Sequence, residues 1–193
     1  MNLKRENSID SLSNKKIENH NGIKIKEISF VNKINLRIDP NNNEHMKVCG
    51  KILNTILPVK PNTYSEYKNL RVLWQSPDEW LIISYDNNDL FINLKKALGD
   101  SEASVTDVSE NRTIFNISGI KLFKLLSKFM VLDFEKNLSN FSSCAQTLFV
   151  KVPILIIRNN NKDKYPDIDI LSNKSHAKYI YDLIIDGTQN LDF

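Results

Sequence analysis

Apolar and polar residues alternate in the first half of the chain in stretches that change from strand-like to helical spacing. Residues 23–39 alternate well enough to predict two strands, ended by Pro40 and an Asn-rich turn. In residues 44–57 the spacing is helical, since apolar residues recur at i, i+3, i+4 and i+7. The residues on that predicted helical face are Cys49, Ile52, Leu53 and Ile56.

A hairpin and a short helix are predicted next. Residues 70–75 and 80–85 are aromatic and β-branched runs on either side of a Ser-Pro-Asp-Glu turn, in which proline presets the turn's φ angle. Residues 86–88 contain candidate N-cap residues, and the apolar positions after them predict a helix that ends at Gly99.

The second half of the chain repeats this order of elements. Residues 103–118 predict two strands that lead through Gly119 into a helix, whose apolar stripe is Leu122, Leu125, Leu126 and Phe129. Residues 145–158 form a long apolar ribbon in which Pro153 marks a bend or an edge position. A strand at residues 167–171 and a helix follow. That last helix is predicted from Ser175 to Gly187, with a buried side of His176, Tyr179, Ile180, Leu183 and Ile184.

Strands joined by hairpin-length loops and punctuated by helices favour an α+β fold with mixed, largely antiparallel sheets. Residues 1–21 lack a periodic apolar pattern and are predicted to form a flexible polar tail. We expect residues 22–193 to form a single globular unit made of two pseudo-repeats, at about 22–100 and 101–188.

Charge and composition exclude several functions. The formal net charge is +3, and the seven Lys and Arg residues among the first 33 exceed the four Asp and Glu there by that same amount. The neutral remainder lacks the clustered cations that bind nucleic acid. The first twenty residues are too polar for a signal peptide, and no apolar run reaches the roughly 20 residues of a membrane span. We therefore expect a cytoplasmic protein that binds neither nucleic acid nor membrane.

Residues suited to cofactor binding or catalysis are sparse. The five glycines are too far apart for a phosphate-binding loop. The two cysteines belong to no metal-binding pattern, and nothing near Cys144 would lower its pKa, so a buried structural thiol is favoured over a reactive one. The histidines stand in the tail or at predicted helix starts, so catalysis by them is not favoured. The sequence predicts no catalytic, cofactor-binding or metal-binding residue in this chain.

Two clusters stand out by their context. Asp78 and Glu79 lie between Trp74 and Trp80, and tryptophans at such positions serve as core or interface anchors. In the second cluster, an acid, a hydroxyl and a guanidinium can form the hydrogen bonds of a tight turn between strands. A contact with folate or with a partner is the alternative. The residues of this cluster are Asp107, Ser109 and Arg112.

Three segments together resemble the gamma subunit family of heterotetrameric sarcosine oxidase. They are SPDEWLIIS (residues 76–84), VTDVSENRTIFNISG (residues 105–119) and SCAQTLFVKVPILIIR (residues 143–158), the last of which includes Cys144 and Gln146. Ser76 departs from the glycine common in the family at this position. The resemblance covers about residues 22–186.

The resemblance implies an aminomethyltransferase-like fold of two intertwined β-α-β subdomains. It also implies a non-catalytic subunit of an oxidoreductase that demethylates sarcosine to glycine, releases hydrogen peroxide and transfers the methyl carbon to tetrahydrofolate. FAD, FMN, NAD, zinc and tetrahydrofolate are then expected in the partner alpha, beta and delta subunits. Two alternatives remain open at this point: a stand-alone folate-binding protein of the aminomethyltransferase or iron–sulfur-assembly type, and a generic α+β binding module.

Overall fold

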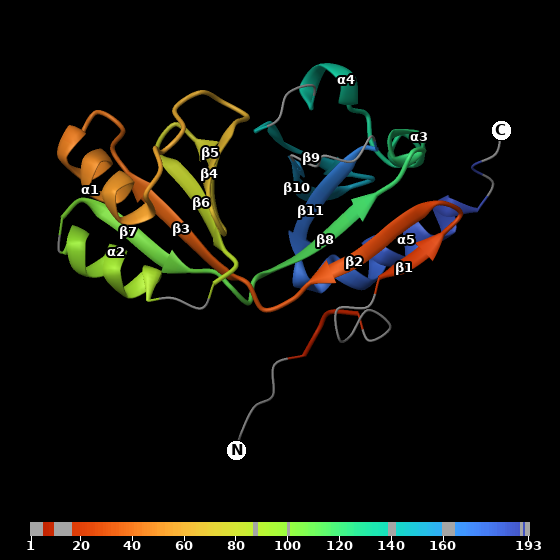
Figure 1. Ribbon diagram of the computed structural model, residues 1–193, viewed down its shortest axis with the longest axis horizontal. Coiled ribbons are helices and arrows are strands. Elements are labelled where there is room, and N and C mark those ends of the chain that lie inside the picture. Colours follow the sequence, from red (N-terminus) through yellow and green to blue (C-terminus); the bar gives the residue numbers. More distant parts are fainter. Residues whose placement is uncertain are drawn as a thin grey trace. The chain divides into compact units, whose positions relative to one another are not determined.

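The computed structural model describes residues 6–9, 17–86, 89–99, 101–138, 142–159, 165–189 and 191. The chain divides into two compact units, each with one sheet and its own helices (Figure 1). The discontinuous unit contains Met1–Phe30 and Asn111–Phe193, and the inserted unit contains Val31–Glu110. The predicted α+β class with antiparallel sheets is confirmed. The chain leaves the discontinuous unit and returns to it, and the expected pair of pseudo-repeats at about 22–100 and 101–188 stays a prediction.

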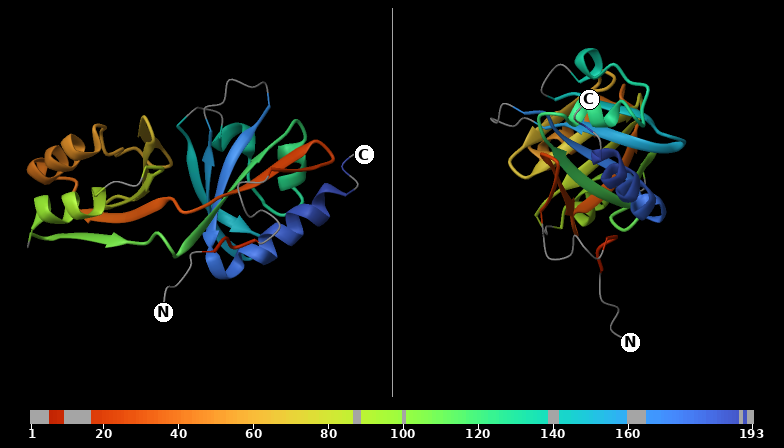
Figure 2. Two further views of the ribbon diagram at one scale, coloured as in Figure 1. Left: turned by 60° about the horizontal axis from the view of Figure 1, so that its bottom comes forward. Right: turned by 90° about the vertical axis from the view of Figure 1, so that its right-hand side faces the viewer.

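The inserted unit has a five-stranded antiparallel sheet in the order β4-β5-β6-β3-β7, and α1 and α2 lie side by side on it (Figure 2). Its elements are β3 (Asn32–Ile38), α1 (Asn43–Leu53), β4 (Tyr64–Tyr67), β5 (Leu70–Ser76), β6 (Glu79–Ser84), α2 (Leu90–Leu98) and β7 (Ala103–Asp107). Alternate residues of β3 pack with the apolar faces of both helices. The predicted hairpin and both predicted helices are therefore present.

Helix α1 ends earlier than its apolar spacing predicts. Asn42 caps its start by accepting hydrogen bonds from the backbone N–H groups of Glu44 and His45. Asn54 ends it in the left-handed conformation, with φ of 52°. Ile56 therefore falls outside the helix and is 76% exposed, so its predicted place on the buried stripe is wrong.

The discontinuous unit has a six-stranded antiparallel sheet in the order β1-β2-β8-β11-β10-β9. Its helical segments include α5, which runs along the sheet (Figure 2). The elements are β1 (Glu18–His20), β2 (Ile23–Ile28), β8 (Arg112–Ser118), α3 (Leu122–Leu126), α4 (Phe134–Asn137), β9 (Cys144–Phe149), β10 (Val152–Arg158), β11 (Asp167–Asn173), η2 (Lys174–His176) and α5 (Ala177–Thr188).

Two parts of the segment expected to be a flexible tail are bound to the discontinuous unit. Strand β1 pairs antiparallel with β2, and Ile9 is a buried member of the core between the sheet and its helices. The polar composition of this segment hides these contacts, because one buried isoleucine and three paired residues supply no periodic pattern.

Glycine and proline punctuate this unit in ways that the structure explains. The pairing of β10 with β11 begins at Ile154, so Pro153 is paired only on the β9 side, which fits the predicted edge position. Gly187 was expected to stop the last helix, but it lies within α5, where an added Cβ would come within 2.6 Å of the Phe129 ring. The absence of a side chain at Gly187 allows α5 to pack closely against Phe129, and the helix does not end at this glycine.

Candidate functional site

The two tryptophans of the β5–β6 hairpin lie directly opposite each other on paired strands. Trp80 is completely buried in the core of the inserted unit, and its indole N–H donates to the Pro58 carbonyl oxygen at 2.8 Å. Trp74 is only partly buried. The hairpin therefore has one core anchor, Trp80, and one partly exposed tryptophan, Trp74.

The two carboxylates between the tryptophans are occupied by neighbouring side chains. Asp78 accepts hydrogen bonds from the Ser76 hydroxyl at 2.8 Å and from Arg37 Nη2 at 2.7 Å. These two contacts hold the pKa of Asp78 below its usual value, and the hydrogen bond from Ser76 has the larger effect. Glu79 accepts from the Asn35 amide at 2.6 Å. Ser76 thus fixes the aspartate next to the turn.

A surface depression of about 550 Å³ lies beside the Arg37–Asp78 ion pair. Its lining residues are Arg37, Ile38, Asp39, Pro40, Asp78, Glu102, Ala103 and Ser104. Three carboxylates oppose a single guanidinium, which is already paired with Asp78. This balance disfavours binding of an anionic ligand such as a phosphate or the glutamate tail of a folate.

Asp107 and Ser109 form a tight turn that is fixed to β3. The Asp107 carboxylate accepts from the backbone N–H of Ser109 at 2.9 Å and from its hydroxyl at 2.6 Å. The Ser109 hydroxyl in turn accepts from the backbone N–H of Lys33 at 3.0 Å. The motif's acid and hydroxyl therefore hold together the two strands through which the chain enters and leaves the inserted unit.

Lys33 completes this arrangement and was not anticipated from the sequence. Its side chain is buried, and the ammonium donates to the carbonyl oxygens of Ser109 at 2.8 Å and Val31 at 3.2 Å. A buried ammonium is costly unless it is hydrogen-bonded, so these contacts are the condition for its burial. Only the contact with the distant turn explains the buried position of Lys33.

Asp107 and Ser109 also line a small cavity, which bears on the folate alternative. The cavity has a volume of about 150 Å³, and its other lining residues are Asn32, Ile34, Asp89, Leu90, Phe91 and Ile92. Pockets that hold drug-sized ligands have volumes of roughly 300–1,000 Å³. This cavity is too small for a folate, and the structure gives the Asp107 turn a structural role.

The remaining motif residues lie in the discontinuous unit. Arg112 begins β8 opposite Asn173, so the segment from Asp107 to Arg112 spans the passage of the chain between the units. On β9, Cys144 is buried and Gln146 is exposed. Burial raises the pKa of the Cys144 thiol to about 12, and that of Cys49 to about 11.

We expect neither thiol to react with Ellman's reagent in the native protein. Both thiols stay protonated at pH 7–9 because their pKa values lie above this range, and burial blocks access to the reagent. Two equivalents should be released after denaturation in urea. Rapid release of one equivalent from the native chain, with a rate that follows a pKa below 9, would contradict the buried, protonated state of that cysteine.

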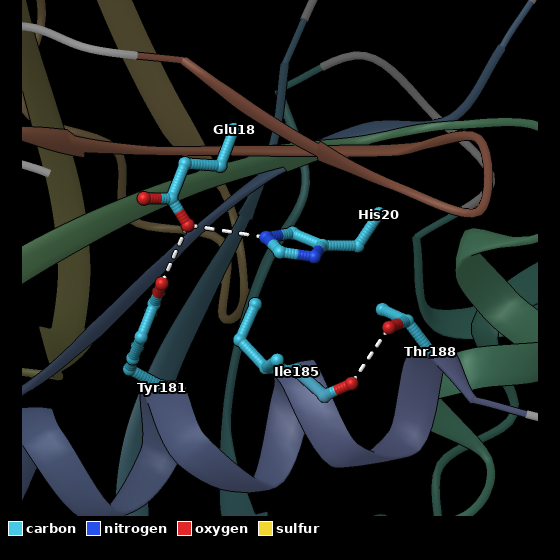
Figure 3. A network of polar contacts seen from close by, with 5 residues as sticks. All are labelled: Glu18, His20, Tyr181, Ile185 and Thr188. Carbon is cyan, nitrogen blue, oxygen red and sulfur yellow. Dashed lines mark hydrogen bonds and ion pairs between the residues drawn. The ribbon is translucent and has the colours of Figure 1, made fainter. Parts of the chain in front are cut away.

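A polar network that the sequence did not indicate joins β1 to α5 in the discontinuous unit (Figure 3). Glu18 accepts from the Tyr181 hydroxyl at 2.5 Å, and its same oxygen lies 3.1 Å from His20 Nε2. Tyr181 and Glu18 are 163 residues apart, so no local motif could reveal the pair. The network fastens β1, a three-residue edge strand, to the last helix.

The described residues contain neither a metal-binding cluster nor a helix able to span a membrane. No group of three or more His, Cys, Asp or Glu side chains there is arranged to hold a metal ion. No helix among them has both the length and the apolar character that crossing a membrane requires.

Comparison with known proteins identifies relatives of this chain. The model of the sarcosine oxidase, gamma subunit family matches residues 37–190. Sarcosine oxidase subunit gamma of Corynebacterium sp. (strain P-1) is 26% identical over 166 residues, which cover 86% of this chain and 79% of that protein. The Arthrobacter sp. subunit gamma is 27% identical over 142 residues, or 73% of this chain and 70% of its own length.

Solved structures share the fold. A chain of the heterotetrameric sarcosine oxidase from Corynebacterium sp. U-96, in complex with pyrrole 2-carboxylate, superposes with a TM-score of 0.81 at 21% identity and covers 95% of this chain and 92% of its own. Aminomethyltransferase T of the glycine cleavage system from Bartonella henselae gives 0.62 at 15% identity, with 85% and 45% covered. The aminomethyltransferase-like fold is confirmed, and the stand-alone folate-binding alternative is not favoured. The chain belongs to the sarcosine oxidase gamma subunit family.

Proposed function

We propose that this chain is the non-catalytic gamma subunit of a heterotetrameric sarcosine oxidase and supports assembly of the complex. The observation that carries the proposal is the family match over residues 37–190. The partners are the alpha, beta and delta subunits, which bind FAD, FMN, NAD, zinc and tetrahydrofolate, and the complex converts sarcosine to glycine with release of hydrogen peroxide.

The geometry of the motif residues supports a structural role. Trp80 anchors a core, Asp78 is paired with Arg37, and Asp107 caps the Ser109 turn. Each of these side chains makes a contact within the fold, as expected of a subunit that has a structural rather than a catalytic role.

Co-expression of the chain with its genomic neighbours tests this proposal. Size-exclusion chromatography should yield a flavin-coloured complex that contains the chain and releases peroxide from sarcosine. Omitting the chain should reduce recovery of the assembled complex, because a surface of another subunit would be left uncovered. A full-sized, fully active complex formed without the chain would show that the chain is not part of the assembly.

We propose that three apolar side chains of the discontinuous unit contact another subunit. Val131 is fully exposed, and Leu148 and Val150 are about half exposed. The backbone N–H of Val150 donates to the Phe129 carbonyl at 2.8 Å, which brings the β9–β10 turn beside the segment that leads to Val131. Clustered exposed apolar residues of this kind mark interaction sites. We call Val131, Leu148 and Val150 the apolar patch.

The backbone at this turn supports the same assignment. Val150 has a φ of 56°, in the left-handed region, where a β-branched residue is strained. Glycine or asparagine would satisfy this turn at lower cost. An exposed valine here is therefore better explained by contact with a partner than by the stability of the isolated chain.

Replacing Val131 or Leu148 by aspartate should lower recovery of the chain in the complex by about tenfold, since desolvating a new charge opposes binding. The measurement is the amount of chain that co-purifies with a tagged partner subunit, with circular dichroism as the check on folding. Ile120→Asp is the matched control, because Ile120 is 69% exposed, between Leu148 at 53% and Val131 at 104%, and lies in the same unit outside the apolar patch. Equal losses for the control and the patch variants would contradict this assignment.

A further inference from the structure

The residues before β1 include a short segment that is bound to the discontinuous unit without being part of its sheet. Glu27, on β2, is buried, with 6% of its surface exposed. Its two carboxylate oxygens accept from consecutive backbone N–H groups, of Ser8 at 2.9 Å and of Ile9 at 3.1 Å. One buried carboxylate thus holds two successive amides of the segment, in charge-assisted hydrogen bonds.

The Ser8 and Ile9 side chains are each held by a different part of the site. The Ser8 hydroxyl is hydrogen-bonded to that of Thr113, which is itself buried. The Ile9 side chain is 3% exposed and belongs to the same apolar core as Ile25 and Phe115. The Glu27 carboxylate therefore binds the backbone of the segment, and the Thr113 hydroxyl binds the serine. The apolar core around Ile25 and Phe115, which we call the apolar slot, accommodates the isoleucine.

The hydrogen bonds of the buried Glu27 carboxylate depend on this segment. Within the described part of the chain, no lysine or arginine pairs with Glu27, and its hydrogen-bond donors are the two amides of the segment. Ser172, the cross-strand neighbour of Thr113, is also buried, and its hydroxyl has no hydrogen-bond partner there. Removal of the segment would take both of these hydrogen-bond donors away from the Glu27 carboxylate.

We propose that Glu27, Thr113 and the slot for Ile9 form a peptide-binding cradle, and that Ser8 and Ile9 are its built-in ligand. The cradle selects a Ser-Ile segment that bends at Ser8 and presents two consecutive free amides to one carboxylate. A cationic ligand group would also meet the Glu27 carboxylate, but it would not fill the apolar slot or engage Thr113. The cradle therefore holds Ser8 and Ile9 against the body of the unit.

Hydrogen exchange of the full-length chain, followed by NMR, tests the bound state directly. The amides of Ser8 and Ile9 should exchange at least tenfold more slowly than in an unstructured peptide. Glu27→Gln should accelerate both amides by about tenfold, because a carboxamide offers only one acceptor oxygen and turns a donor toward the other amide. Glu102→Gln, at an exposed position of the inserted unit, is the matched control and should change neither amide. Unprotected Ser8 and Ile9 amides in the wild-type chain would overturn the proposal.

A peptide added in trans tests whether the cradle is a binding site. The full-length Ile9→Asp chain, whose own segment should be released, is titrated with a fluorescent peptide of residues 5–12, RENSIDSL. We expect fluorescence anisotropy to show at least tenfold tighter binding than to the wild-type chain, where the cradle is filled, and no binding of the peptide with aspartate in place of isoleucine. Equal binding of both peptides, or none to a variant that circular dichroism shows to be folded, would overturn the proposal.

The milder variant Ile9→Ala keeps the test decisive if Ile9→Asp does not fold. It should accelerate exchange of the Ser8 and Ile9 amides while those of β8 and β11 stay protected, since a weakened ligand opens locally. Ile17→Ala is its control, because Ile17 is 58% exposed and precedes β1. Simultaneous loss of protection in the segment and in β8 and β11 would show that the segment is an integral part of the core and not a bound ligand. Protection should not depend on chain concentration; if it does, the cradle is filled by the segment of a second copy and the proposal fails.

Discussion

Replacing Trp80 by alanine should lower the free energy of unfolding of the inserted unit by about 3–5 kcal/mol. The indole is completely buried among residues of β3, β5, α1 and α2, and its truncation leaves a large cavity. The substitution also removes the donor to the Pro58 carbonyl oxygen. Urea denaturation of the full-length chain, followed by circular dichroism, measures the loss.

Trp74→Ala is the matched control, because Trp74 lies opposite Trp80 on the paired strand but is only partly buried. Its loss should be less than half that of Trp80→Ala, since less apolar surface returns to water. The two are the chain's only tryptophans, so each variant reports the emission of the other. Trp80 alone should emit at shorter wavelength than Trp74 alone. Equal destabilisation, or identical emission maxima, would contradict the assignment of Trp80 as the core anchor.

Short-range patterns predicted most of the secondary structure. Alternation located β2 and β3, and the Ser-Pro-Asp-Glu turn located the β5–β6 hairpin with three of its four strand ends displaced by one residue. Such signals succeed because strand alternation and turn chemistry depend on neighbouring residues. Strand β4, with the sequence YSEY, went unpredicted: only its first residue is buried, so it lacks the alternation of a half-buried strand.

Contacts between distant residues could not be predicted in the same way. Ile9 is buried because Glu27 holds its amide, and β1 is fastened by Tyr181 from the far end of the chain. The end of α1 depended on the left-handed Asn54, although the apolar spacing continued to Ile56. For Ile9 and β1 the deciding interaction lies outside the window in which periodicity is read, whereas α1 ends at a local backbone conformation that apolar spacing does not report.

The sequence predicted which residues belong to the candidate site better than it predicted which residues they contact. The motif containing Asp107 and Ser109 could be identified from the sequence, and a tight turn was the favoured interpretation. Its attachment to Lys33 depends on the pairing of β3 with β7, which brings together residues 76 positions apart. The resemblance identified the family from ordered motifs, whereas their physical roles became evident only from the three-dimensional contacts.

Gly119 closes one of those motifs, and its replacement by alanine should lower the free energy of unfolding of the discontinuous unit by about 3–4 kcal/mol. Its φ of 156° is a conformation that residues with a side chain rarely adopt. An added Cβ would also lie 2.5 Å from the Gly22 carbonyl oxygen and 2.9 Å from Ile23 Cδ1. The first of these atoms belongs to the backbone that enters β2, so relief of the clash requires a shift of the strand.

Gly22→Ala separates the two contributions to this loss. Gly22 has a φ of 79°, but an added Cβ there would meet nothing within 4 Å, so only conformational strain of about 1–2 kcal/mol is expected. Urea denaturation of both variants gives the difference, which measures the close approach of the two chain segments. If both substitutions lower the free energy of unfolding equally, the backbone conformation alone explains the glycine at the end of the segment of residues 105–119. A larger loss for Gly119→Ala would instead show that the motif keeps this glycine so that β2 can pass directly beside the end of β8.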